Sequence, residues 1–167
     1  SLGSIKVLYH NNGNADMSFS IRGKSDLLFL DETGRVGIGT TAPSEKLEVN
    51  GNVLATNVTV PSDRRLKRDI EPISNALRIA TRLQGVSYKW RTDENPDRGF
   101  DDGRHLGFIA QDAAAVLPEA VNAADDGMYS MSYDEVIPVL LEAIKEQQTM
   151  IEAQTERIAA LEARIRP

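Results

Sequence analysis

The sequence predicts an α+β fold built from three consecutive regions, and three patterns lead to that prediction. Residues 1–61 form short runs of β-type residues separated by Gly and Asn. Residues 62–132 alternate helical and strand-like runs, as expected of a small α+β module. Residues 133–167 repeat isoleucine at every seventh position, which is typical of a long coiled-coil helix. We therefore expect a β-structured segment, an α+β module and a coiled-coil helix, in that order.

The β-type runs of region 1–61 are short and bounded by turn residues. They read SIKVLYH, DMSFSIRG, DLLFLDETGRVGIGT and KLEVNGNVLATNVTV. Tight turns are expected at Asp31–Gly34 and Asn50–Asn52, where Gly or Asn adopts a positive φ at little cost. These runs contain few large apolar residues, too few to build a sizeable core within one chain. We therefore expect the strands to be intertwined between copies of the chain. A small independent β-domain is the alternative.

The middle region is expected to alternate helices and strands. EPISNALRIATRLQG predicts a helix with Pro72 at its first position and Gly85 as its stop. VSYKW, at 86–90, alternates like a strand, and a polar loop follows it. LGFIAQDAAAVLPEAV predicts a short strand that turns into a helix ending near Pro118, and GMYSMSYDEV returns as a hairpin.

A capping box is expected at the start of the C-terminal helix, with Ser132 and Glu135 each bonding the other's backbone N–H. Pro138 lies just past the first turn and should make the helix start irregular. Arg157 at a g position and Glu162 at the following e position can pair between parallel chains. The a and d positions are Ile137, Leu140, Ile144, Gln147, Ile151, Gln154, Ile158, Leu161 and Ile165.

The heptads alone leave the number of helices open. Ile at a with Leu at d is the dimer pattern, and the two Gln layers set the register without deciding the number. One long amphipathic helix lying on its own domain is the alternative to a coiled coil.

Composition excludes several classes of protein. The formal net charge of -6, with 41% hydrophobic and 5% aromatic residues, argues against a nucleic-acid partner. No apolar run is long enough to span a membrane, so no membrane partner is expected. The absence of cysteine excludes disulfides and thiolate sites. The chain begins with Ser1 rather than Met and shows no signal peptide, so we expect it to be part of a longer protein.

Three features of the sequence resemble parts of ligand or catalytic sites, but none of them fits fully. GRVGIGTT lacks the spacing and the lysine of a phosphate loop, and indicates a strand with glycines where backbones approach closely. The loop 93–103 begins like an EF-hand, but Arg98 stands where glycine is required, which favours a solvated acidic loop. The only histidines, His10 and His105, have no local triad or metal pattern around them. We expect no metal and no cofactor.

TVPSDRRLKRDIEP, at the boundary between the first two regions, contains Ser62 and Lys67. A serine hydroxyl is a poor nucleophile until a base removes its proton, and a neutral lysine does this in Ser-Lys sites. A lysine amine must first lose its charge, which burial and neighbouring like charges favour. The three arginines of the stretch supply like charges and its two aspartates oppose them: Arg64, Arg65, Arg68, Asp63 and Asp69.

The spacing of Ser62 and Lys67 restricts how they can meet. Five residues correspond to about 140° around a helix, and to opposite faces of a strand. The pair therefore meets only in a turn or loop, or between chains. A basic linker with an ordinary serine is the alternative.

Five motifs in order resemble the endosialidase-type C-terminal intramolecular chaperone. They are SDRRLKRDIEPI at 62–73, VSYKW at 86–90, GFIAQD at 107–112, LPEAV at 117–121 and YDEVIPVLLEAIKEQ at 133–147. This family is an autoprocessing peptidase domain at the end of phage tailspikes and tail fibres, and it is similar to a module of myelin regulatory factor proteins. The upstream GRVGIGTTAPSEKLEVNGNV is similar to the β-rich segments that often precede the domain.

The resemblance implies a mechanism. Three chains assemble through the chaperone, which brings the fibre strands into register, and a Ser-Lys dyad then cuts each chain once. Carried over by motif, the serine is Ser62 and the lysine is Lys67. Family precedent favours cleavage of Ser62–Asp63; an N-to-O acyl shift at Pro61–Ser62 is the alternative, and attack within or between chains stays open.

The resemblance also implies where the protein works and with what. The expected partners are two further copies of the chain, joined by a trimeric coiled coil, and the upstream fibre. The expected location is a virion tail fibre or tailspike, assembled in the host cytoplasm, with the chaperone released after cleavage. A trimerisation domain that is not cleaved and stays as the fibre tip is the alternative function.

Overall fold

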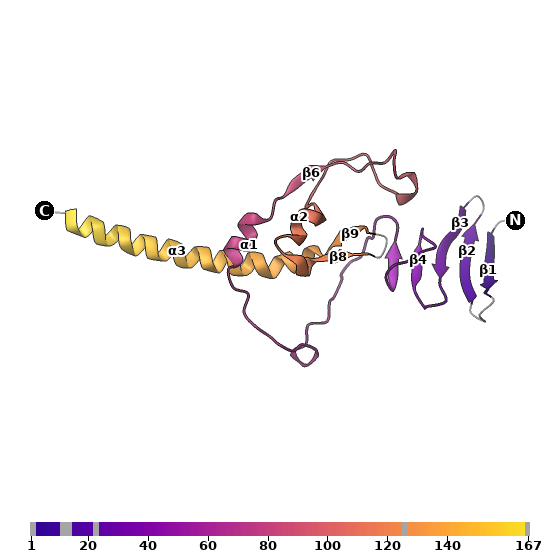
Figure 1. The fold of residues 1–167 in the computed structure, drawn as a ribbon, viewed down its shortest axis with the longest axis horizontal. Coiled ribbons are helices and arrows are strands. Elements are labelled where there is room, and N and C mark those ends of the chain that lie inside the picture. Colours follow the sequence, from indigo (N-terminus) through magenta and orange to yellow (C-terminus); the bar gives the residue numbers. More distant parts are fainter. Residues whose placement is uncertain (1–2, 11–14, 22–23, 125–126, 166–167) are drawn as a thin grey trace. The chain divides into compact units, whose positions relative to one another are not determined.

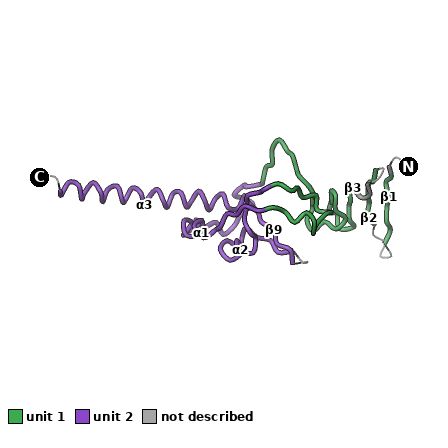
Figure 2. Tube along the Cα trace, turned by 90° about the horizontal axis from the view of Figure 1, so that it is seen from above, with its two compact units in different colours: residues 1–60, 89–103 green, residues 61–88, 104–167 purple. Residues whose placement is uncertain are grey.

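The computed structural model describes residues 3–10, 15–21, 24–124 and 127–165. The chain divides into two compact units, residues 1–60 with 89–103 and residues 61–88 with 104–167 (Figures 1 and 2). In chain order the elements are β1 (Gly3–Tyr9), β2 (Ala15–Ile21), β3 (Lys24–Leu30), β4 (Val36–Ile38), β5 (Leu47–Val49), η1 (Arg64–Leu66), α1 (Ala76–Arg82), β6 (Val86–Tyr88), η2 (Pro96–Arg98), β7 (His105–Gly107), α2 (Ala110–Ala114), η3 (Pro118–Ala120), β8 (Val121–Ala123), β9 (Tyr129–Met131), η4 (Tyr133–Glu135) and α3 (Val136–Ile165).

Unit 1 is built on a sheet whose strands follow chain order from β1 to β5. The pairs are antiparallel as far as β4, and β4 pairs with β5 in parallel. Apolar residues face one another across the strands, as Val7 faces Met17 and Leu28 faces Ile38. The prediction of a β-structured N-terminal region is confirmed; Arg22 and Gly23, at the end of the second β-type run, lie outside the described residues.

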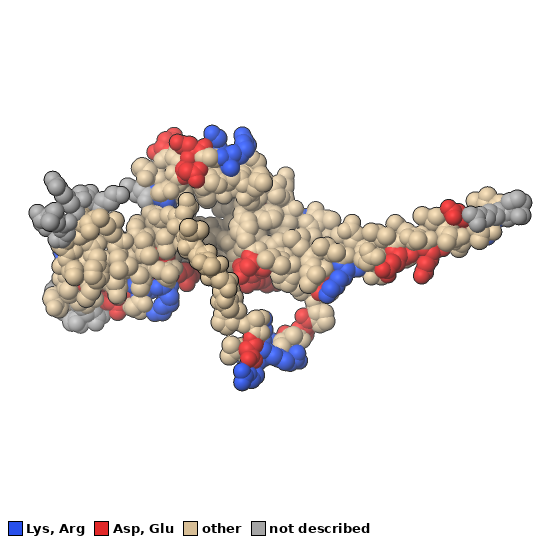
Figure 3. All heavy atoms as spheres, turned by 180° about the vertical axis from the view of Figure 1, so that it is seen from behind, with Lys and Arg blue, Asp and Glu red and all other residues tan. Residues whose placement is uncertain are grey.

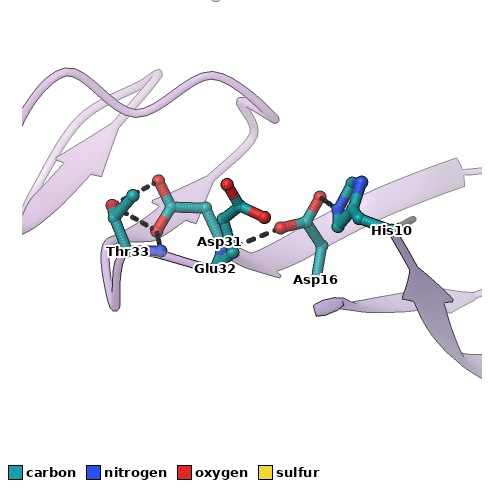
Figure 4. Close-up of polar contacts among 5 residues, drawn as sticks. All are labelled: His10, Asp16, Asp31, Glu32 and Thr33. Atoms are coloured by element: carbon teal, nitrogen blue, oxygen red, sulfur yellow. Dashed lines mark hydrogen bonds and ion pairs between the residues drawn. The ribbon is translucent and has the colours of Figure 1, made fainter. Parts of the chain in front are cut away.

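Polar contacts hold the ends of these strands (Figure 4). The Asp16 carboxylate lies 2.9 Å from the His10 ring and accepts a 2.8 Å bond from the backbone N–H of Glu32. Asp31 accepts bonds from the backbone N–H groups of Arg35 and Thr33, which together lower the pKa of its carboxyl, the Arg35 bond most strongly. The tight turn predicted at Asp31–Gly34 is confirmed by a 3.1 Å bond from the N–H of Gly34 to the carbonyl of Asp31.

Glycines allow the close backbone approach that the sequence predicted around β4. A Cβ at Gly37 would clash with the backbone carbonyl of Thr40, and one at Gly39 would lie 3.2 Å from the carbonyl oxygen of Asn50. Gly39 also has a φ of +72°, a conformation that side chains disfavour. These contacts bring the connection after β4 back alongside β5.

The sheet of unit 1 buries little apolar surface. Phe29 is 6% exposed, whereas Ile5, Ile21 and Leu47 each leave more than half of their surface exposed. Because burial of apolar surface is the main stabilising term in folding, this sheet gains little stability from its own chain.

The last β-type run, KLEVNGNVLATNVTV, is a strand only at β5. Residues 51–60 are all exposed and contain no strand, and Leu54 reaches 101% exposure. The expectation of a strand beyond Val49 is therefore wrong for the single chain. A β-type sequence becomes a strand only where a neighbouring backbone supplies hydrogen bonds, and the described chain offers none to this stretch.

Unit 2 has its core where α1 packs against the first turns of α3 (Figure 1). The buried residues of this core are Ala76, Leu117, Ala120, Val136, Val139 and Ala143. The β6–β7 pair and the β8–β9 hairpin are both antiparallel, and β6 confirms the strand predicted in VSYKW. Of the hairpin predicted in GMYSMSYDEV, only β9 lies in that stretch: its partner β8 precedes it, and the stretch continues into η4 and α3. The α+β class is thus confirmed.

The start of α1 differs from the sequence prediction. The helix begins at Ala76 rather than at Pro72, because Asn75 adopts a left-handed conformation with a φ of 56°. Asn75 makes no side-chain cap. Instead, the Glu146 carboxylate of α3 accepts bonds of 2.9 Å and 3.0 Å from the backbone N–H groups of Ala76 and Leu77. A residue from another helix therefore caps α1.

The predicted capping box is also wrong. Ser132 precedes the short helix η4 and makes no side-chain cap bond; its backbone carbonyl accepts a bond from the N–H of Glu135 at 3.3 Å. The irregular start expected from Pro138 takes the form of this 3-10 turn. Pro138 itself lies in the first turn of α3, where its missing N–H has no helical partner to lose.

Two adjacent faces of α3 have different surroundings. Val136, Val139 and Ala143 are buried against unit 2, whereas every predicted a and d position is exposed, including Ile144 at 62%. Beyond Glu146 all the described residues of α3 are exposed. Among the described residues, none of the helices is both long and apolar enough to cross a membrane.

Candidate functional site

Ser62 and Lys67 meet within a single chain. Lys67 Nζ donates a hydrogen bond of 2.9 Å to Ser62 Oγ. The residues between them are neither a long helix nor a strand, but the 3-10 turn η1 with extended residues on each side. The turn that the five-residue spacing required is therefore present, and no second chain is needed to bring the two side chains together.

Asp63 builds this turn. Its backbone carbonyl accepts a 3.0 Å bond from the N–H of Leu66, and its carboxylate accepts a 2.8 Å bond from the N–H of Arg65 as the cap of η1. The N–H of Lys67 then bonds the carbonyl of Arg64 at 3.1 Å. These bonds fold the chain back so that Lys67 reaches the residue before the cap.

The side chain of Arg65 makes two further hydrogen bonds to the Asp63 carboxylate. Its Nε lies 3.0 Å from Asp63 Oδ1 and its Nη2 lies 2.7 Å from Oδ2. The bonds from Arg65 lower the pKa of the Asp63 carboxyl, and Asp63 in turn raises the pKa of the Arg65 guanidinium. The sequence identified Asp63 as an opposing charge but not as a cap, although Asp is a favoured residue at helix N-termini.

The aspartates oppose the arginines around Lys67, as the sequence predicted. Arg65 is paired with Asp63, and Arg68 Nε lies 3.6 Å from Asp69 Oδ2 in a highly exposed pair. At least two of the three cations are thus offset by neighbouring carboxylates.

The site lies in an exposed stretch. All residues from 51 to 75 are exposed, and Figure 3 shows a loop at the lower edge of the view where basic and acidic residues gather. Within its own chain, therefore, the hydrogen-bonded pair of Ser62 and Lys67 has water as its main surroundings.

The remaining candidates lie elsewhere in the fold. His10 pairs with Asp16 in unit 1, and the ring of His105 lies 5.6 Å from that of Tyr88 in unit 2. In the acidic loop 93–103, Asn95 bonds the carbonyl of Arg91. Among the described residues, no three His, Cys, Asp or Glu side chains gather as a metal site would require.

Comparison with known proteins identifies the domain that begins at the site. A family model described as chaperone of endosialidase, in the S74 peptidase class, matches residues 62–122. An uncharacterized membrane protein of Dictyostelium discoideum is 33% identical over 68% of this chain and 7% of its own length.

Two relatives belong to the kinds of protein that the sequence motifs suggested. The long tail fibre protein Gp37 of Salmonella phage S16 is 34% identical over 46% of this chain and 10% of its own length. Myelin regulatory factor homolog 1 of Caenorhabditis elegans is 35% identical over 56% of this chain and 11% of its own length.

The matched region is a small part of each of these relatives, at most 11% of their length, so the likeness concerns this domain and not their whole activity. The S74 peptidase family implies an autoproteolytic serine peptidase. Residues 62–122 therefore match the chaperone of endosialidase family, and the chain is similar over this domain to phage tail fibre proteins.

Proposed function

We propose that this chain trimerises through residues 62–167, aligns the β-structured segment upstream of Ser62, and then severs itself once beside Ser62 with Lys67 as the base. The observation that carries the proposal is the 2.9 Å hydrogen bond between Lys67 Nζ and Ser62 Oγ. The family match begins at Ser62, which supports a peptidase role for this end of the domain.

The chemistry proceeds in two balanced steps. The neutral Lys67 amine accepts the proton of the Ser62 hydroxyl as Oγ bonds to a peptide carbonyl carbon. The C–N bond then breaks, Lys67 returns the proton to the leaving amine, and an ester remains on the serine. Water hydrolyses that ester with Lys67 again accepting and returning a proton, so each cut consumes one water.

The geometry of attack differs for the two bonds beside Ser62. Attack on the Pro61 carbonyl by the hydroxyl of the same chain is an N-to-O acyl shift and cuts Pro61–Ser62. Attack of Ser62 Oγ on its own carbonyl would close a strained β-lactone ring. Cleavage of Ser62–Asp63 therefore takes the hydroxyl from a neighbouring chain.

Assembly buries the dyad, which the single chain leaves exposed to water. The loop 51–75 is exposed, whereas burial favours the neutral form of an amine. We place the switch at trimer formation: packing of neighbouring chains over this loop removes water from the dyad, so cleavage follows assembly.

The trimer forms through the exposed a and d face of α3. That face is apolar along most of its length, and isolated helices of this kind are marginal in water unless they are packed. We place the working protein in a virion tail fibre or tailspike, with residues 62–132 as the chaperone module, residues 133–167 as the trimerising helix and residues 1–61 as the fibre part.

Denaturing gel electrophoresis tests the proposal. Wild-type protein is expected to separate into two fragments, while Ser62→Ala and Lys67→Ala chains stay intact. Mass spectrometry identifies the bond, since fragments 1–61 and 62–167 indicate Pro61–Ser62 and fragments 1–62 and 63–167 indicate Ser62–Asp63. Wild-type chains co-expressed with longer, tagged Ser62→Ala chains distinguish attack between chains, because a Ser62→Ala chain can be cut only by the serine of a neighbour.

Two results would count against the proposal. Wild-type chains that stay intact while sedimenting as trimers would favour a permanent fibre-tip domain. Fragments that persist in Ser62→Ala protein would assign the cut to a contaminating protease.

A further inference from the structure

We propose that Arg65 is a positioning residue: by engaging both carboxylate oxygens of Asp63, it keeps that anion from pairing with Lys67 and leaves Lys67 Nζ to Ser62. This inference rests on the proposed Ser62–Lys67 dyad and adds to it a residue that controls when the base is available. It is argued from the order of charges along the turn and from the bonds that they make.

In the sequence of the turn, a carboxylate lies between the nucleophile and the base. Asp63 follows Ser62 directly and precedes Lys67 by four residues, within the same 3-10 turn. An unoccupied carboxylate so close to an ammonium would attract it, and opposite charges within a few ångströms stabilise the charged form of a base. Such a pairing would hold Lys67 protonated and draw it from the hydroxyl.

Arg65 prevents the pairing of Asp63 with Lys67, because two N–H donors of its guanidinium match the two carboxylate oxygens. Nε and Nη2 each bond one carboxylate oxygen, at 3.0 Å and 2.7 Å, and the backbone N–H of Arg65 adds a bond to Oδ1 at 2.8 Å. A planar guanidinium holds a carboxylate with both oxygens at once, which the point charge of a lysine cannot do. Lys67 is then left bonded to Ser62 at 2.9 Å.

The other charges of the segment do not compete for Asp63. Arg68 lies beside Asp69 at 3.6 Å. The titratable groups near Lys67 in sequence are Asp63, Arg64, Arg65, Arg68 and Asp69. All belong to the exposed stretch 51–75, and among the described residues the Lys67 amine has no ion pair with a group from another element.

The test compares two variants that remove the same charge from the same turn. Arg65→Ala frees the Asp63 carboxylate, whereas Arg64→Ala removes a neighbouring cation that is outside the pair. The rate of self-cleavage is measured against pH for both. In Arg65→Ala, the pH at which cleavage reaches half of its maximal rate is expected to rise about one unit more than in Arg64→Ala. The plateau rate at high pH should stay within a few-fold of wild type.

A second substitution separates charge from shape. Asp63→Asn together with Arg65→Ala removes the freed anion but keeps an oxygen that can cap η1, so the pH profile is expected to return to that of wild type. Asp63→Ala removes the cap itself and is expected to lower the plateau rate about tenfold, since general-base catalysis depends on positioning. Because it also leaves Arg65 as an unpaired cation, its profile should not move to higher pH. A merely structural role for Arg65 would lower the rate equally at every pH.

A measurement independent of cutting keeps this inference apart from the proposed function. In Ser62→Ala protein, which is not cut, the Lys67 Cε resonance is titrated by NMR in the presence and absence of Arg65→Ala. A larger upward movement of the titration midpoint with Arg65→Ala than with Arg64→Ala supports the inference. Equal movements would overturn it, even if wild-type protein cuts at Ser62; failure of wild type to cut would overturn the proposed function alone.

Discussion

At Gly107 the backbone of β7 runs against two aromatic side chains. A Cβ there would clash with the Tyr133 hydroxyl and would lie 3.2 Å from the ring of Tyr88. The same hydroxyl accepts a 3.0 Å bond from the N–H of Phe108, and burial raises the pKa of Tyr88, with Tyr133 adding to the effect. β7 is thereby held against η4, immediately before α3.

Gly107→Ala is expected to destabilise unit 2 by about 1–3 kcal/mol, because the added methyl group forces a backbone or ring to move. Urea unfolding followed by circular dichroism measures the loss. Gly85→Ala is the matched control, since a Cβ there meets nothing within 4 Å and the position has no positive φ. We expect that control to be neutral or slightly stabilising; equal losses in the two variants would contradict the role assigned to the contact.

At the scale of elements, α1 depends on α3 for its start. The helix has seven residues, too few to be stable alone, and its first two free N–H groups bond the Glu146 carboxylate. One side chain thus satisfies part of the open end of α1 and fixes its position along α3.

Glu146→Ala is expected to lower the unfolding free energy of unit 2 by about 1 kcal/mol, the usual cost of losing a helix cap. Glu146→Gln should lose less, because its amide oxygen still accepts one bond. Glu156→Ala, on the exposed part of the same helix, serves as control and should change stability by less than about 0.5 kcal/mol. A loss in Glu156→Ala as large as in Glu146→Ala would mean that helix propensity, and not the cap, sets the effect.

Elements with a repeating pattern were predictable from the sequence, and elements that depend on distant partners were not. The seven-residue repeat predicted α3, and alternation predicted β6. The start of α1 was wrong because its cap lies seventy residues away in the sequence. The missing strand in 51–60 has the same origin, since sequence reports the tendency to pair but not the presence of a partner.

The candidate site was predictable in part. The spacing of Ser62 and Lys67 required a turn or a second chain, and the structure has the turn. The closure of Arg65 onto Asp63 could not be read from the sequence, because three arginines and two aspartates in eight positions allow many pairings of similar energy.

At the scale of the whole molecule, the exposed a and d face of α3 is expected to hold three chains together. Ile158→Lys places a charge in the predicted seam, whereas Ala160→Lys places the same residue on an outward-facing position of the same turn. Analytical ultracentrifugation should give the mass of three chains for wild type and for Ala160→Lys, and a smaller mass for Ile158→Lys. If the Ile158→Lys protein were still trimeric, the a and d face of α3 would not be what holds the chains together.

The exposure of residues 51–75 has a consequence for the fate of chains that never assemble. Arg64, Arg65, Lys67 and Arg68 present consecutive recognition points for trypsin-like enzymes on an accessible backbone. A single chain is therefore open to foreign proteases in the same stretch that contains the proposed self-cleavage site. Packing of this stretch between chains would close that route, so assembled chains are expected to resist trypsin at this loop while single chains are cut there.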